Sequence, residues 1–118
     1  MTIRPGQFVL AGGHERHATN VFVCSSTVQR LRGLLGREEL LVDNIFWLYP
    51  CSSIHTCFMK SAIDVVYLDE LHRIIKLVSS LLPWGFSNCR SAVSVLELAE
   101  GKIDVLKLNV GDHFQCEA

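Results

Sequence analysis

The sequence predicts a mainly β fold, either a β-sandwich or a partly closed barrel, with one or two short helices. Many short apolar runs follow one another at close spacing, and glycine, proline and aspartate punctuate them as turns. Only one segment shows clear helical periodicity. The chain of 118 residues fits a single domain, 1–118, with its core at about 21–116, and no repeat, low-complexity tract or linker divides it.

The expected strands are short apolar runs that end at turn residues. They cover residues 8–11, 21–24, part of 40–49, 63–68, 73–78, 93–98 and 113–116. The run 63–68 is the clearest, because both of its alternating faces are largely apolar, and such a strand should be covered on both sides. Residues 69–72 are expected to form the turn to its hairpin partner.

The one clear helix is expected over about 27–35. Ser26 and Gln29 have capping-box spacing, so their side chains can satisfy the unpaired backbone N–H groups at the helix start. Apolar residues then recur on one face, and Gly36 supplies a C-terminal stop.

A long irregular segment is expected over 79–92, and a turn or short helix over 101–108. The irregular segment contains Trp84 and Phe86. These rings could form an exposed contact patch, or they could plug the open end of a sandwich. The plug is the favoured interpretation.

Charge and composition argue against several classes of function. The chain has 11 lysines and arginines against 12 aspartates and glutamates, with a formal net charge of −1. This balance gives no footprint for nucleic acid or for an anionic membrane. No apolar stretch approaches the roughly 20 residues of a membrane span, and the N-terminus lacks the hydrophobic region of a signal peptide. The expected location is therefore the cytoplasm.

Cysteine usage agrees with a reducing compartment. The five cysteines are Cys24, Cys51, Cys57, Cys89 and Cys116. In the cytoplasm they should be free thiols or metal ligands, not disulfides. Two of them, Cys24 and Cys116, fall in runs expected to be strands, where cysteine behaves as a small hydrophobe.

The most informative stretch is 49–69, where polar and soft side chains crowd against an apolar strand. The crowded residues are Cys51, His55, Cys57, Met59, Lys60 and Asp64. Because such groups are costly to bury without partners, they form either a site or a carefully satisfied piece of core.

Four blocks of the sequence, spread over about 21–116, resemble the DUF192 family of small bacterial and archaeal domains. The blocks are RLRGLLGREEL, PCSSIHTCFMKSAIDVVYLDELHRIIKLV, SVLELAEGK and NVGD. The residues that carry the resemblance are Arg32, 33–37, His55, Thr56, Met59, Lys60, Ile63, Asp64, Val65, 96–98, Gly101, Gly111 and Asp112. The resemblance implies a compact, mainly β domain with small helical elements. It implies no activity, and Cys57 departs from the family pattern.

The leading functional hypothesis is a non-catalytic binding or accessory module for a small molecule or a protein. Its pocket would be lined by His55, Lys60 and Asp64, with Cys57 and Cys51 as further candidates. The two basic groups can contact an anionic group, and the aspartate can orient either of them through a charge-assisted hydrogen bond. The structural alternative is that Asp64 accepts backbone N–H groups and locks a turn.

The rival hypothesis is an enzyme or metal protein. Cys57 could act as a nucleophile with His55 as its base, or His55 and the cysteines could bind a metal. Cysteines at 51 and 57 are not spaced as a zinc knuckle, however, and no complete catalytic set is visible. We therefore predict no catalytic residue, no metal and no cofactor.

A structural ion pair is expected between Arg32 and Glu97. The arginine lies on the predicted helix, and the glutamate interrupts the apolar strand 93–98. Loss of one partner from a buried pair would strand a charge, at a cost of about 3–5 kcal/mol.

Overall fold

The computed structural model describes residues 2–10, 15–24, 44–57 and 59–116. The strands within these ranges are β1 (Thr2–Val9), β2 (Glu15–Cys24), β3 (Asn44–Leu48), β4 (Ser53–His55), β5 (Ile63–Leu68), β6 (Ile74–Leu81), β7 (Phe86–Asn88), β8 (Ser94–Ala99) and β9 (His113–Cys116), and the helix is α2 (Lys102–Leu106). The predicted helix at 27–35 lies outside the described residues.

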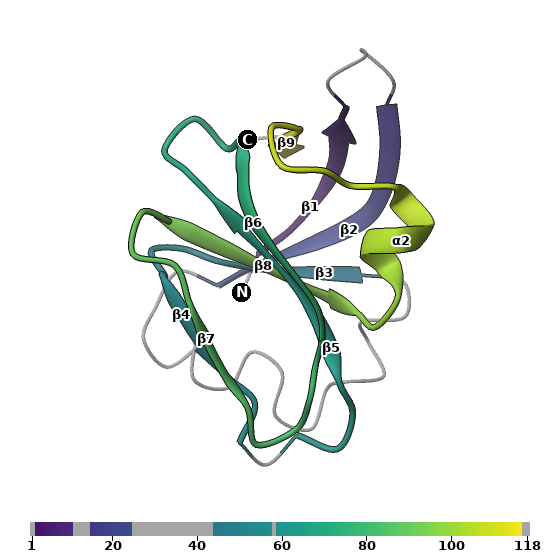
Figure 1. Cartoon of the computed structure of the whole chain (residues 1–118). Coiled ribbons are helices and arrows are strands. Elements are labelled where there is room, and N and C mark those ends of the chain that lie inside the picture. The colour runs from purple at the N-terminus through teal and green to yellow at the C-terminus, as the bar shows by residue number, and fades with distance from the viewer. Residues whose placement is uncertain (1, 11–14, 25–43, 58, 117–118) are drawn as a thin grey trace.

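Seven strands form one sheet in the order β6–β5–β8–β3–β2–β1–β9, and β4 pairs with β7 in a second, two-stranded sheet. The large sheet curls like half of a barrel, and the small sheet lies on one side of it (Figure 1). Neighbouring strands are antiparallel except β2 and β3, which run parallel. The predicted mainly β fold with a short helix is thus confirmed.

The core has a layer on each face of the large sheet. β5 is buried along its whole length, as the sequence predicts for a strand that is covered on both sides. Val66 and Leu68 pack on the face that α2 covers, with Ile103. Val65 and Tyr67 pack on the other face, which the small sheet covers.

The irregular segment expected over 79–92 is only partly irregular. β6 continues to Leu81, and β7 pairs with β4 so that His55 lies opposite Phe86. A three-residue strand is too short to show a period-2 pattern, and its partner is distant in sequence, so no hairpin turn signals the pairing. The predicted strands at 63–68 and 113–116 are confirmed.

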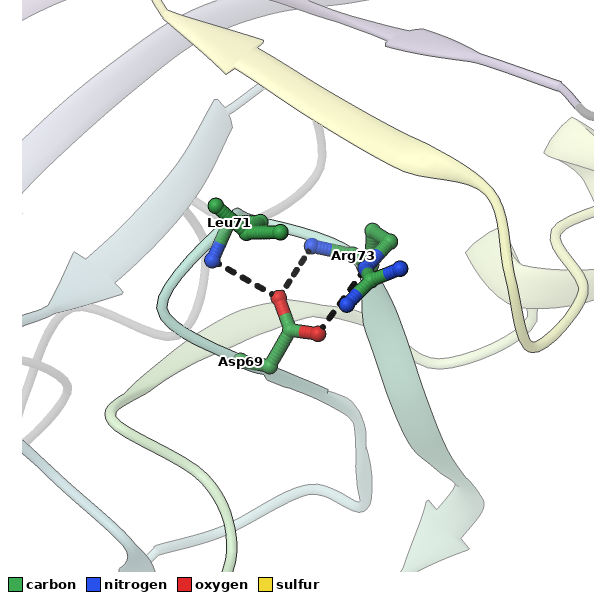
Figure 2. A network of polar contacts seen from close by, with 3 residues as sticks. All are labelled: Asp69, Leu71 and Arg73. Carbon is green, nitrogen blue, oxygen red and sulfur yellow. Dashed lines mark hydrogen bonds and ion pairs between the residues drawn. The ribbon is translucent and has the colours of Figure 1, made fainter.

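Asp69 holds the turn between β5 and β6. Its Oδ1 accepts the N–H groups of Leu71 and Arg73, both at 2.9 Å, and its Oδ2 forms an ion pair with Arg73 Nε at 3.0 Å (Figure 2). Burial alone would raise the pKa of this carboxyl, but the N–H groups and the guanidinium outweigh it and hold the pKa below its ordinary value of 3.8. The predicted turn at 69–72 is confirmed, and the Asp69 carboxylate stabilises it from within.

In the part of the chain that the structure describes, no helix has both the length and the apolar character needed to cross a membrane.

Candidate functional site

Asp64 lies in β5, and it is 0% exposed. Its Oδ1 accepts the N–H of Ser80 at 2.9 Å, and its Oδ2 accepts the N–H groups of Gly101 at 3.1 Å and Ile103 at 2.9 Å. The helix α2 has no side-chain cap of its own, so a carboxylate from a distant strand accepts its first N–H groups. This side chain therefore ties β5, β6 and the start of α2 together.

The structure does not bring Asp64 and His55 together. Asp64 points to the face of the large sheet that α2 covers. β4, which carries His55, packs over the opposite face through Ile54. The hydrogen bonds of Asp64 match the structural alternative, in which an aspartate satisfies backbone N–H groups.

The remaining candidate residues lie at or beside the small sheet. His55 and Lys60 are exposed, whereas Cys51 and Cys57 are half-buried. The Cys51 thiol donates to the carbonyl of Ser53 at 3.0 Å. The two basic side chains therefore have access to solvent, and the thiols are only partly accessible.

No metal site is found among the described residues. No group of three histidine, cysteine, aspartate or glutamate side chains converges there in a way that could hold an ion. The described cysteines Cys51, Cys57, Cys89 and Cys116 are not in disulfides.

Thr56, which the sequence analysis did not propose as a site residue, organises this region. Its buried Oγ1 donates to the carbonyl of Leu82 at 2.6 Å and accepts the N–H of Gly85 at 2.7 Å. Its backbone N–H donates to the Gly85 carbonyl, and its carbonyl accepts the N–H of Trp84, both at 3.0 Å. One threonine thus fastens the turn at 82–85 to the end of β4. Its place in the motif shared with DUF192 is the only sequence signal for this role.

The fastened turn is tight and has an unusual backbone. A Cβ at Gly85 would meet the Leu82 carbonyl oxygen at 2.8 Å, so only glycine fits without a shift. Trp84 has φ = 61°, a left-handed conformation that is rare for a bulky side chain. Such a conformation persists only where the surroundings enforce it, and the hydrogen bonds of Thr56 do so here.

The turn displays three large apolar side chains, which we call the aromatic turn: Leu82, Trp84 and Phe86. Their exposed fractions are 66%, 64% and 66%. The other exposed large apolar side chains of the described residues are scattered over Tyr49, Leu71, Val105 and Val110. The interpretation of Trp84 and Phe86 as a plug is therefore wrong, because plugging side chains would be buried.

His55 extends the aromatic turn onto the small sheet. It lies opposite Phe86, and both are exposed while the central residue of each strand points inward. The backbone bond from Thr56 to Gly85 places the preceding pair, His55 and Phe86, at a non-hydrogen-bonded position. Cross-strand side chains are closest at such positions, so His55 and Phe86 are neighbours on the exposed face of the small sheet.

A polar cluster lies under the small sheet. The Tyr67 hydroxyl and the Ser87 hydroxyl are 2.8 Å apart in a hydrogen bond. Burial raises the pKa of Tyr67, the bond to Ser87 opposes this, and the nearby Cys51, Cys89 and Glu97 raise the pKa further. The cluster therefore keeps the phenol protonated and attaches the small sheet to β5.

Glu97 lies in β8 opposite Val65 and is only 4% exposed. Its Oε2 has no hydrogen-bond partner among the described residues. Burial raises the pKa of this carboxyl to about 8. Arg32, its predicted ion-pair partner, lies outside the described residues, so that pair stays a prediction.

These features define a class of small β domain: a curled sheet, a small second sheet packed on it, and a fastened aromatic turn. The chain belongs to the DUF192 family, described as "Uncharacterized ACR", whose model matches residues 8–116. The resemblance inferred from the sequence motifs is thus confirmed.

Two archaeal relatives show the same family at moderate identity. A UPF0127 protein of Pyrococcus furiosus is 31% identical over 94 residues, which cover 75% of this chain and 78% of that protein. A UPF0127 protein of Thermococcus sibiricus is 29% identical over 103 residues, which cover 82% of this chain and 66% of that protein.

Two solved structures share the fold at low identity. A "putative transcription regulator" from Sinorhizobium meliloti has a TM-score of 0.88 at 17% identity, covering 98% of this chain and 94% of its own. A protein of unknown function from Novosphingobium aromaticivorans has a TM-score of 0.81 at 16% identity, covering 96% and 84%. At this identity the likeness concerns the fold alone.

Proposed function

We propose that this domain is a non-catalytic binding module. Its contact surface consists of the aromatic turn together with His55 and Lys60. The observation that carries the proposal is the combination of three apolar side chains, each about two-thirds exposed, with a turn that one buried threonine holds rigid.

The exposed side chains of the aromatic turn favour binding and do not contribute to folding. Displaying Trp84 and Phe86 to water gains nothing for folding, because burial of apolar surface is what stabilises the fold. Aromatic side chains on a rigid support lose little conformational freedom on binding, and they dominate the energetics of many interfaces. A preformed turn therefore favours association.

The candidate residues divide into two roles within this proposal. His55, which lies opposite Phe86, and Lys60, five residues further along the chain, would supply polar contacts. Asp64 acts on the other face of the sheet, where it holds the end of β6 that leads into the turn. Cys51 and Cys57 lie beside the surface and are only half-exposed.

Site-specific photocrosslinking in cells that express the full chain tests the proposal. A photoreactive phenylalanine analogue is placed at Phe86 and, as a matched control, at Val110, which is 62% exposed and lies outside the surface. We expect a discrete adduct from the first position only. Replacing His55 or Lys60 by alanine should weaken that adduct.

A second variant tests whether the rigid turn matters. Gly85→Ala removes no exposed side chain but forces the turn to shift, because its Cβ would meet the Leu82 carbonyl oxygen. We expect it to reduce the adduct at Phe86. Equal crosslinking at Phe86 and Val110, or none at either, would contradict the binding function.

A further inference from the structure

We infer that the contact surface takes an extended acidic segment of a partner protein, one in which carboxylates alternate with apolar side chains. This inference rests on the proposed binding function, and it adds the chemistry of the ligand. Three observations lead to it: the apolar side chains displayed, the basic groups around them, and the acid-free segments that build the surface.

The segments that form the surface contain no acidic residue. Neither 44–63 nor 71–96 holds an aspartate or glutamate, although the chain has 12 of them. If the acids were evenly spread, several would fall in these two segments. Their absence leaves the strands, the turn and the adjoining connections without a group that would repel a carboxylate.

Basic groups lie on and near the small sheet. Lys76 donates through Nζ to the carbonyl of Asn88 at 2.7 Å, which places its ammonium group at the edge of β7. Arg90 follows two residues after Asn88 and is exposed, His55 is exposed on β4, and Lys60, five residues further along the chain, is exposed as well. Lys76 thus places a positive charge at the edge of β7, the strand that carries Phe86.

This arrangement fits a peptide better than a nucleic acid. An oligonucleotide carries one charge per nucleotide along its length, and proteins that bind it usually track that backbone with a long basic groove. Here the basic groups are few, the whole chain has a net charge of −1, and one of the three displayed side chains, Leu82, is aliphatic and cannot stack on a base. An acidic peptide matches both the exposed apolar side chains and the basic groups on and near the small sheet.

A displayed library of random peptides of about 12 residues, selected on the immobilised full chain, tests the inference. We expect the retained sequences to be rich in aspartate and glutamate, with leucine or an aromatic residue among them. A retained peptide is then labelled and its affinity is measured by fluorescence anisotropy. Raising the salt from about 50 mM to about 300 mM should weaken binding, because exposed charge pairs are screened.

Charge-reversal variants locate the interaction. Lys60→Glu combined with Arg90→Glu should weaken the labelled peptide at least about tenfold, since like charges replace attractive pairs. Lys107→Glu is the matched control, because Lys107 is exposed and lies just after α2, away from the small sheet. We expect it to change the affinity less than about twofold.

The outcomes separate this inference from the proposed function. The retained peptides could be neutral or basic and fail to bind the Trp84→Ala and Phe86→Ala variants. That result would contradict the acidic ligand, but it would support the proposed binding function. Binding of an oligothymidylate of about 15 nucleotides that depends on the same two residues would overturn the acidic ligand in favour of single-stranded nucleic acid. If no ligand depends on Trp84 or Phe86, both proposals fail.

Discussion

Two buried carboxylates on neighbouring strands of one sheet have opposite surroundings. Asp64 of β5 accepts three backbone N–H groups on the α2 face. Glu97 of β8 points to the other face, and its Oε2 finds no partner among the described residues. The two strands are paired, with Val65 opposite Glu97, so the carboxylates lie close in the fold and differ only in what surrounds them.

Both carboxyl groups are buried, so the comparison shows that the number of N–H groups donating to a buried carboxyl determines its role in the fold. Asp64 is an anchor, because three backbone N–H groups, one in β6 and two at the start of α2, depend on it as an acceptor. Among the described residues no donor reaches Glu97 Oε2, and burial raises the pKa of this carboxyl to about 8, which favours its protonated form at neutral pH. Asp64 therefore stabilises the fold through its hydrogen bonds, whereas Glu97 makes the stability of the fold depend on pH.

Removing the Asp64 carboxylate should have the largest effect on stability. Asp64→Ala leaves three N–H groups, one buried and two partly buried, without an acceptor, so we expect the free energy of unfolding to fall by about 3–5 kcal/mol. Asp64→Asn keeps one oxygen and should cost less. Urea unfolding measures both variants. The control is Asp104→Ala on the exposed side of α2, which should change stability by less than about 0.5 kcal/mol.

An Asp64→Ala variant with stability close to that of the unchanged chain would contradict the anchoring role. The difference between Asp64 and Glu97 would then not lie in their hydrogen bonds.

Stability should depend on pH through Glu97. The unfolded chain releases this proton near pH 4.5, whereas the folded chain keeps it until about pH 8. The folded state therefore binds more protons between those values, and the free energy of unfolding should fall as the pH rises, by about 2–3 kcal/mol from pH 5 to pH 7. Glu97→Gln should remove this dependence, as measured by urea unfolding at each pH.

The same titration tests the predicted Arg32–Glu97 pair. A paired glutamate would be held in its charged form, so stability would rise with pH across its titration. Arg32→Met would then destabilise the chain in a way that depends on Glu97. A rise in stability that disappears in Arg32→Met would establish the pair and contradict a protonated Glu97.

Thr56 extends the comparison to a neutral group, since its hydroxyl is both buried and fully used. Thr56→Ala removes the bonds to Leu82 and Gly85, and we expect a loss of about 1–2 kcal/mol. Hydrogen exchange at the Gly85 amide should accelerate more than exchange within β5. Thr56→Ser keeps the hydroxyl and is the matched control. Unchanged exchange at Gly85 in Thr56→Ala would show that the turn is held by other contacts.

Asp69 is the partly exposed counterpart of Asp64, with 19% of its side chain exposed, and its replacement should have the smallest effect. Its hydrogen bonds to Leu71 and Arg73 compete with water, so Asp69→Ala should cost about 1 kcal/mol or less. The pKa of Asp69 lies below its ordinary 3.8, so this contribution is present above that pH and is lost as the pH falls through the lowered pKa. A loss as large as that of Asp64→Ala would mean that exposure does not weaken such an anchor.

Particular residues show how far the sequence could lead to the site. Ile63–Leu68 was identified as a doubly covered strand because its apolar residues occupy both alternating faces. Thr56 could not be identified as the anchor of the aromatic turn, because its partners lie in a segment 26 and 29 residues away. The sequence indicates that Trp84 and Phe86 form either a contact patch or a plug. Whether they face solvent depends on the pairing of β4 with β7, which no local sequence pattern predicts.

The amino-acid sequence by itself determined the β-rich class, the family, the doubly covered strand and the turn at Asp69. These properties follow from alternation, local turn chemistry and motif order, all of which act between near neighbours. The tertiary structure alone decided that Asp64 and the imidazole of His55 face different layers, that Glu97 Oε2 finds no donor among the described residues, and that the aromatic turn points outward. Each of these depends on which distant segments pack together, and packing is set by the whole chain.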